Sequence, residues 1–289
     1  MKLYRGMDVG TSKATSADRA RVPHHLVDVA DPSESMTVSR VVALADAAIA
    51  DLAARGRVAL AVGGTTLYLK ALLFGVFEGP GADEVRRAAL EAEAREKGTA
   101  ALHDRLRTVD PDAARRIHPM DLRRLVRALE VHGATGTPIS SLQVEWTRLR
   151  PRYPHRLLAL RRPRADLHAR IAARVAAMER AGLVGEVRRL LAAPGGLGRT
   201  ASQAIGAKEV AAWLRGDLPT LAAALESVRT RTNRLARMQE TWLRSFPGMT
   251  FLEVGADEPP EVTARRALAA LEAAPSQQGA GGVGEEVGA

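Results

Sequence analysis

The residues best suited to chemistry are Gly63-Gly64-Thr65-Thr66, which follow the apolar run 58–62 directly. A glycine-rich turn that leads into a helix points free backbone N–H groups at an anion, and threonine hydroxyls add further hydrogen bonds. In open α/β sheets, ligands bind where strands end at their carboxyl side. We therefore expect a phosphate or diphosphate here. A plain tight turn with a threonine N-cap is an equally good interpretation of these residues alone.

Arg174 is a second candidate because it sits beside the predicted buried face of a helix. That face carries Leu167, Ile171, Val175 and Met178. A guanidinium next to an apolar stripe must be paired or must meet an anionic ligand. The commoner alternative is an arginine whose stem packs while its head reaches water.

A row of arginines lines the polar face of the helix predicted after Asp121. Arg123, Arg124 and Arg127 lie opposite an apolar face at i, i+3 and i+4 spacing. An RNA backbone would relieve their mutual repulsion, although a solvated face near Glu130 is the simpler interpretation. Arg231, Arg234 and Arg237 repeat the pattern in a later helix, with the same alternative.

Two other patterns fail on spacing. Residues 6–13 lack the G-x-x-x-x-G-K-[ST] spacing of a phosphate loop, because only three residues separate the glycines. His24-His25 followed by Asp28 offers no third ligand at suitable spacing, so we expect no protein metal site. The absence of Cys excludes disulfides, thiolate metal sites and cysteine nucleophiles.

Composition favours a cytoplasmic protein with an anionic partner. The 289 residues carry 42 Lys+Arg against 33 Asp+Glu, a net charge of +9, which suits nucleic acid without proving it. With 46% hydrophobic residues the chain can bury a core. No apolar run is long enough to cross a membrane, and no signal peptide is visible.

The elements that must position these residues alternate in type, which indicates an α/β fold. Helical spacing predicts helices at 41–52, 67–73, 122–132, 166–180, 184–191 and 218–244, with Asp83, Thr99 and Asp121 as N-caps. Apolar runs predict strands at 58–62, buried on both faces, and at 156–160 and 250–254. We divide the chain into a core (1–78), a helical insert (79–150), a second core part (151–256) and a terminal helix with a disordered tail (257–289).

Several motifs, in order along the chain, resemble the tRNA dimethylallyltransferases, also called tRNA isopentenyltransferases. The matching segments are Tyr4 to Lys13, Val22 to Val29, Val62 to Tyr68, Arg116 to Pro119, Arg124 to Glu130, Thr135 to Pro138, Gln203 to Gly206 and Gln239 to Trp242. The resemblance covers the chain from Met1 to about Val254, and this many ordered motifs are far more specific than one glycine-rich loop.

The resemblance implies a fold, an activity and partners. The fold is a P-loop NTPase-like parallel-sheet core with an all-helical insert that contacts tRNA. The activity is transfer of a dimethylallyl group from dimethylallyl diphosphate to N6 of adenosine 37, beside the anticodon, with Mg²⁺. The expected partners are the tRNA anticodon stem-loop and dimethylallyl diphosphate, and we expect a monomer.

The family pattern also implies roles for individual residues. Thr65 contacts the reacting groups, Arg174 helps to hold the diphosphate, and Gly63, Gly64 and Thr66 complete the substrate loop. The expected tRNA contacts are Met1, Lys2, Arg86, Arg123, Arg124, Leu125, Val126, Arg127, Ala204, Ile205, Gly206, Ala207, Lys208 and Glu209.

The chain also departs from the family pattern. Family members begin with a strand, a GPTxSGK[ST] phosphate loop and an Asp-Ser pair, about 40 residues by comparison with P-loop domains, and this sequence starts after them. Ala207, Met238 and Met36 replace a Tyr, an Arg and an aromatic residue. We therefore expect the first strand and the phosphate loop to be missing and the activity of this chain to be impaired. The alternatives are a non-catalytic tRNA-binding relative and, third, a small-molecule kinase on a P-loop-type core.

Overall fold

The computed structural model describes residues 1–289 except 77–78, 82, 144–149, 275 and 278–289. The chain forms two units, and each is described by itself. The first unit combines Met1–Leu72 with Tyr153–Ala289, and the second is Leu73–Arg152. The helical insert expected from the sequence spans 79–150. Most of the expected tail lies outside the described residues.

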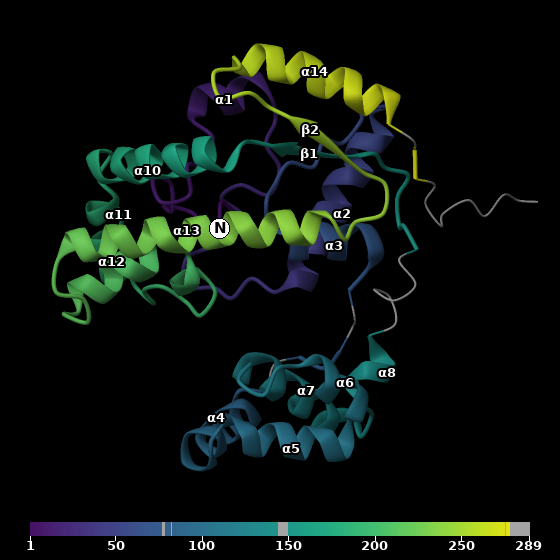
Figure 1. Cartoon of the computed structure of the whole chain (residues 1–289), viewed down its shortest axis with the longest axis vertical. Helices are drawn as coiled ribbons and strands as arrows, with labels where there is room; N and C mark the ends of the chain where they lie inside the picture. Colours follow the sequence, from purple (N-terminus) through teal and green to yellow (C-terminus); the bar gives the residue numbers. More distant parts are fainter. Residues whose placement is uncertain (77–78, 82, 144–149, 275, 278–289) are drawn as a thin grey trace, which may run out of the picture. The chain divides into compact units, whose positions relative to one another are not determined.

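The first unit contains a two-stranded parallel sheet (Figure 1). Strand β1 (Leu157–Arg161) pairs with β2 (Met249–Glu253), with Leu157 opposite Met249. Both strands match the strands predicted from the apolar runs. Helix α14 (Pro260–Ala273) contacts both of them. The sheet therefore joins the beginning and the end of the second core part, and the terminal helix packs against both strands.

The strand predicted at 58–62 is not formed. The side chains of Val58, Leu60 and Val62 are 94%, 76% and 85% exposed. An apolar run becomes a buried strand only when a neighbouring strand accepts its hydrogen bonds and its faces are covered, and no strand among the described residues does so. The described residues therefore form mostly helices with a small parallel sheet, in place of the larger parallel-sheet core that the sequence predicted.

Helices make up most of the first unit, and several begin at a residue whose side chain caps the helix. Thr37 accepts the N–H of Arg40, and Thr220 accepts the N–H of Ala223. The helices are α1 (Ser16–Arg21), α2 (Val38–Ala54), α3 (Thr66–Phe74), α10 (Arg164–Arg180), α11 (Leu183–Ala192), the 3₁₀ turn η1 (Ala201–Gln203), α12 (Ala207–Leu214) and α13 (Leu221–Leu243). Helix α13 packs against α10 and α12, so it is the central support of this unit.

The second unit is helical throughout its described elements: α4 (Glu84–Lys97), α5 (Thr99–Val109), α6 (Pro111–Arg116), α7 (Leu122–Thr135) and α8 (Ile139–Leu142). The predicted N-caps Asp83 and Asp121 are confirmed, since each side chain accepts a backbone N–H of the following turn. Thr99 instead is the first helical residue, after Gly98. Leu102, Leu106, Leu125 and Val131 are fully buried and form the core.

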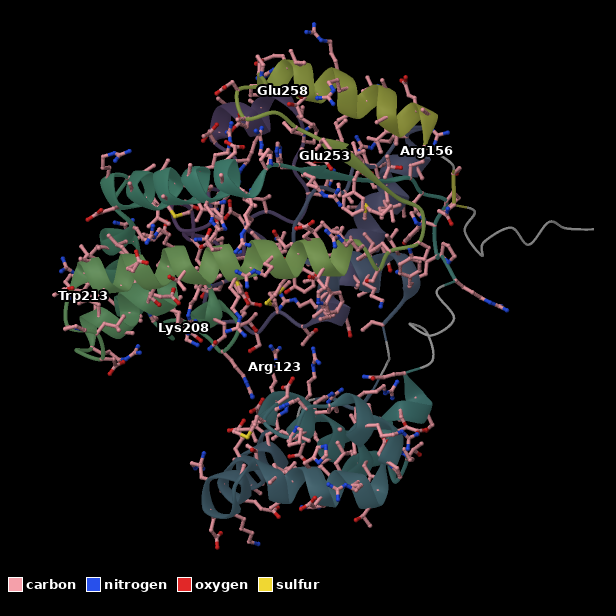
Figure 2. The ribbon with its side chains drawn as sticks, viewed as in Figure 1. Arg123, Arg156, Lys208, Trp213, Glu253 and Glu258 are labelled. Atoms are coloured by element: carbon pink, nitrogen blue, oxygen red, sulfur yellow. The ribbon has the colours of Figure 1, made fainter. Side chains whose placement is uncertain are left out.

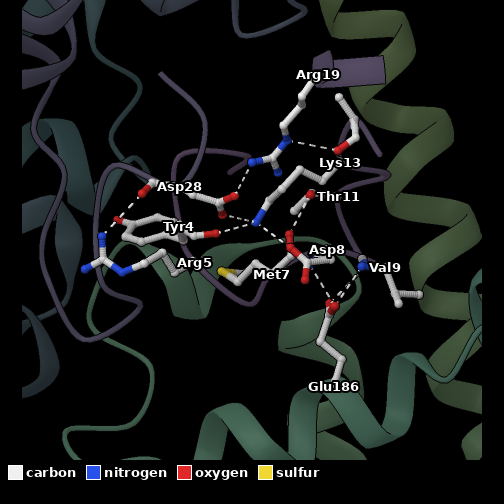
Figure 3. Close-up of polar contacts among 12 residues, drawn as sticks. Tyr4, Arg5, Met7, Asp8, Val9, Thr11, Lys13, Arg19, Asp28 and Glu186 are labelled. Carbon is white, nitrogen blue, oxygen red and sulfur yellow. Dashed lines mark hydrogen bonds and ion pairs between the residues drawn. The ribbon is translucent and has the colours of Figure 1, made fainter. Parts of the chain in front are cut away.

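The N-terminal segment is fixed to the first unit by two charged side chains (Figure 3). Glu186 of α11 accepts the backbone N–H groups of Asp8, Val9 and Gly10 at 2.7, 2.7 and 3.0 Å. Lys13 has a nearly buried side chain that pairs with Asp8 and with Asp28 at 2.6 Å. Burial would raise the pKa of Asp28, but hydrogen bonds from Lys13 and Arg19 outweigh it and lower that pKa. The residues that spacing excluded as a phosphate loop thus form a structural turn.

Candidate functional site

The Gly-Thr loop ends where α3 begins. Thr65 directly precedes the helix, and its carbonyl oxygen accepts the N–H groups of Tyr68 and Leu69. Its side chain is exposed, and its hydroxyl makes no hydrogen bond to any residue that the structure describes. Thr65 therefore does not act as a side-chain cap, which leaves both its hydroxyl and its backbone N–H free for a ligand.

Gly64 is held from a distant part of the chain. The Nε2 atom of Gln239, on α13, donates a hydrogen bond of 2.7 Å to the carbonyl oxygen of Gly64. A Cβ atom at position 64 would collide with that Nε2 atom, whereas one at Gly63 would meet nothing. Glycine at position 64 is thus required by this close approach.

Arg174 lies on α10 among the apolar positions predicted from its spacing. Ile171, Val175 and Met178 are buried, which confirms the predicted face of the helix. Arg174 itself is exposed. Within the described part of the chain it has no ion pair, in contrast to Arg170 one turn earlier, which pairs with Asp166 at 3.0 Å. It is therefore an uncommitted cation on a helix that packs against α13.

The arginine row on α7 divides into free and committed members. Arg123 is exposed and, in the described residues, carries no ion pair, and Figure 2 marks its position. Arg124 lies 3.4 Å from Asp121. Arg127 instead pairs with Glu130 at 2.7 Å and donates to the carbonyl oxygen of Pro80 at 3.1 Å. Arg123 and Arg124 are the more exposed of the three, and Arg127 is the one bound to a buried carboxylate.

Glu130 is the buried centre of this arrangement. Its carboxylate is fully buried, accepts the backbone N–H of Asp83 at 2.8 Å, and pairs with Arg87 at 2.8 Å as well as with Arg127. Burial alone would raise the pKa of Glu130, but the hydrogen bonds from Arg127 and Arg87 lower it below its ordinary value. The sequence placed Glu130 only near the arginine row, which could be a solvated face or an RNA-binding one, and gave no sign that its carboxylate is buried.

Several residues expected to touch tRNA have buried side chains. Leu125 and Val126 lie in the core of the second unit, and Ala204, Ala207 and Glu209 are buried in the first. Glu209 accepts the N–H of Gly206 at 2.7 Å and pairs with Arg231 at 3.1 Å. These five side chains are part of the packed interior and support the surface above them. An RNA contact from their segments must therefore come from backbone atoms or from neighbouring side chains.

Gly206 is buried as well, and the other expected contacts reach the surface. Met1, Lys2 and Arg86 are exposed, and Ile205 and Lys208 are half-buried. The guanidinium of Arg86 lies against Gly133, where a Cβ atom would collide with it, and its Nε atom is 3.3 Å from Asp83. Lys208 donates to Gln203 at 3.0 Å. Despite these contacts, the side chains of Arg86 and Lys208 remain partly accessible to solvent.

No metal centre is built into the described residues. They contain no group of three or more His, Asp or Glu side chains that could hold an ion. We derive no chemical step through a protein-bound Mg²⁺. None of the described helices is long and apolar enough to span a membrane.

A family model described as IPP transferase matches residues 2–246, most of the chain. The chain belongs to the IPP transferase family. A tRNA dimethylallyltransferase from Anaeromyxobacter dehalogenans (strain 2CP-C) is 51% identical over 92% of this chain and 87% of the relative. The enzyme of the same name from Rhodopirellula baltica is 46% identical over 84% of this chain and 73% of the relative.

Solved structures of IPP transferases agree with this assignment. The tRNA isopentenylpyrophosphate transferase of Bacillus halodurans is 35% identical, with a TM-score of 0.63 over 93% of this chain and 84% of that one. A eukaryotic dimethylallyltransferase acting on tRNA, at 24% identity and a TM-score of 0.73, covers 93% of this chain and 69% of its own and supports the fold. Because the family match starts at residue 2, it gives no support to the expected loss of a phosphate loop.

Three residues that hold these segments in place could not be found from their local sequence: Gln239, Glu130 and Glu186. Gln239 and Glu130 were visible only as parts of family motifs. Each makes its contact across a long stretch of sequence, up to 178 positions for Glu186 and Asp8. A sequence signal exists for Gly64 alone, since a glycine pair before a helix marks a close approach of backbone.

Proposed function

We propose that the chain transfers a dimethylallyl group from dimethylallyl diphosphate to N6 of adenosine 37 in tRNA. Membership of the IPP transferase family over residues 2–246 is the observation that carries the proposal, and the names of the relatives point to the same substrates. The open Gly-Thr loop and the uncommitted Arg174 supply groups that such a reaction needs.

In this reaction the amine nitrogen of adenine attacks the allylic carbon. A bond forms between N6 and that carbon, the bond from the carbon to the diphosphate oxygen breaks, and diphosphate leaves with the bonding electrons. The nitrogen then loses one proton to a base or to water. The protein must hold an anion, orient two substrates and present an extruded base.

We assign the anion to the Gly-Thr loop and Arg174. The free N–H and hydroxyl groups of Thr65 would donate to a diphosphate oxygen, with Gly63, Gly64 and Thr66 shaping the turn around it. The guanidinium of Arg174 suits a phosphate group because its planar donors match two oxygens at once. Both groups stabilise the charge that grows on the leaving group.

We assign the tRNA anticodon stem-loop to basic residues that are exposed or, in the case of Lys208, half-buried. Arg123, Arg124 and Arg86 in the second unit, and Lys2 and Lys208 in the first, present charge to which phosphates can bind. Mg²⁺ would be bound through the substrate diphosphate. We further propose that the protein is a cytoplasmic monomer.

Label transfer tests the proposal directly. The chain is incubated with labelled dimethylallyl diphosphate and an unmodified tRNA bearing A36 and A37, and tRNA binding is measured separately. Transfer supports the proposal. Binding without transfer supports the non-catalytic tRNA-binding relative, and transfer of a labelled γ-phosphate from ATP to a small molecule would instead support the kinase; either outcome overturns the proposal.

A further inference from the structure

The segment that carries Thr65 has few attachments to the rest of the molecule. Residues 57–65 are exposed, and 58–63 lie in no helix or strand. Among the described residues, the hydrogen bond from Gln239 to Gly64 is the one that joins 58–64 to another element. The position of the loop before α3 is therefore set chiefly from α13.

A second contact lies one turn further along both helices. The Nζ atom of Lys70 is 5.8 Å from the centre of the Trp242 ring. Lys70 follows Thr66 by four residues, and Trp242 follows Gln239 by three, so each pair shares one face of its helix. Burial lowers the pKa of Lys70. Helix α13 thus holds both the loop and the first turns of α3.

The hydrogen bond to Gly64 fixes the direction of a whole peptide group. The carbonyl of Gly64 and the N–H of Thr65 belong to the same planar trans peptide, so they point in opposite directions. When Gln239 draws the carbonyl towards α13, the N–H of Thr65 must point away from α13. That N–H then emerges on the same residue as the free hydroxyl of Thr65.

We propose that Gln239 is a positioning residue that turns the 64–65 peptide so that the N–H of Thr65 faces a diphosphate oxygen. This inference rests on the proposed function for the identity of the anion. Glycine at position 64 belongs to the same device, because a Cβ there would push the Gln239 amide away. Without the hydrogen bond from Gln239, the 64–65 peptide could rotate, and the N–H of Thr65 would not be held in one direction beside the hydroxyl.

The inference predicts a specific loss of diphosphate affinity. Gln239→Ala should weaken binding of inorganic pyrophosphate about fivefold to tenfold, as expected for the loss of one oriented hydrogen bond. Gln239→Glu should bind pyrophosphate more weakly still, because an ionised carboxylate cannot donate a hydrogen bond to the carbonyl oxygen of Gly64 and repels it. Gly64→Ala should resemble Gln239→Ala, and the double variant should be no worse than either one, since both remove the same contact.

Calorimetric titration of the full chain with pyrophosphate tests this without relying on transfer. Thr230→Ala is the matched control, because its exposed hydroxyl bonds only within α13. The tRNA affinity and the melting temperature should stay at wild-type values in Gln239→Ala, which a merely structural role would not allow. Wild-type pyrophosphate affinity in Gln239→Ala, or additive losses in the double variant, would overturn the inference.

The two proposals can fail separately. A wild-type chain that binds pyrophosphate, loses that binding on Gln239→Ala, and transfers nothing to tRNA would contradict the proposed function and support the positioning role. If the wild-type chain transfers dimethylallyl groups while Gln239→Ala binds pyrophosphate as well as the wild type, the proposed function is supported and the positioning role is overturned. No binding of pyrophosphate by the wild type would overturn the inference.

Discussion

At the scale of single residues, the site is defined by side chains without partners. The Thr65 hydroxyl and the Arg174 guanidinium have no partner within the described residues, whereas Arg170, one turn before Arg174, is bound to Asp166. An exposed side chain without a partner costs the fold little, so replacing it tests ligand binding without destabilising the protein.

Thr65→Ala should slow single-turnover transfer by about a hundredfold, the typical loss for one donor to a developing negative charge. Thr65→Ser keeps a hydroxyl and should recover most of the rate. Thermal unfolding should be unchanged in both variants, because the hydroxyl has no partner in the described part of the fold. An unchanged rate in Thr65→Ala would remove Thr65 from the site.

Arg174→Ala should raise the KM for dimethylallyl diphosphate about tenfold to a hundredfold, as for the loss of hydrogen bonds to a charged group. Arg170→Ala is the matched control, since that guanidinium is already bound to Asp166. Steady-state kinetics at saturating tRNA measure both variants. Equal KM values for the two variants would return Arg174 to the role of a solvated surface arginine.

At the scale of elements, α7 and the ion pairs around Glu130 support the second unit. The pKa of Glu130 is lowered from its ordinary value of 4.5, so its charged form is favoured by folding. A carboxyl with a depressed folded pKa stabilises the protein above its unfolded pKa and loses that stabilisation as pH falls through the folded value. The second unit should therefore be sensitive to acid.

Glu130→Gln should flatten the fall in melting temperature of the second unit as pH drops below about 4.5, because the group that titrates is gone. Glu130→Ala should destabilise this unit by about 3 kcal/mol near pH 7, the low end for breaking a buried pair, because Arg87 and Arg127 are partly exposed. Calorimetry between pH 3 and 7 measures both. A wild-type pH profile in Glu130→Gln would contradict the account.

Arg123→Ala should weaken tRNA binding and reduce the slope of log affinity against log salt by about 1, as expected when one phosphate contact is lost. Arg127→Ala should instead lower the melting temperature with little change in that slope, because its guanidinium is bound to Glu130 and Pro80. Filter binding across a salt series separates the two. The opposite assignment of effects would contradict this division of the arginine row.

Segment 58–62 is predicted to promote self-association, because exposed, alternating apolar residues without a paired strand attract other chains. Leu60→Lys should raise the concentration at which light scattering begins. Leu268→Lys, at a singly exposed leucine of α14, should leave that onset unchanged. If Leu60→Lys leaves that onset unchanged, segment 58–62 does not promote self-association.

Local patterns predicted the helices well and the sheet only in part. Asp83 and Asp121 were identifiable because capping depends on three or four consecutive residues. The strand at 58–62 was predicted wrongly because pairing depends on another strand and not on apolar character. The loop residues were identifiable from their glycines and threonines, but Gln239 reaches Gly64 across 175 positions, a contact that no local spacing encodes.

At the scale of the whole molecule, the count of 42 Lys and Arg residues overstates the number of basic side chains available to RNA. Arg127 and Arg87 on the second unit and Arg170 on the first are committed to carboxylates. Exposed members such as Arg123 are the ones that can neutralise tRNA phosphates and release the counterions condensed on the tRNA. The surface thus suits a polyanion, while the chemistry is concentrated at the Gly-Thr loop held by α13.

The measurement that most directly tests the central claim is the identity of the modified nucleoside. Unmodified tRNA is incubated with the chain and dimethylallyl diphosphate, digested to nucleosides, and analysed by chromatography and mass spectrometry, beside a tRNA carrying guanosine at position 37. The account predicts N6-dimethylallyladenosine from the first tRNA and none from the second. Unmodified adenosine at position 37 in tRNA that the chain has bound would contradict it.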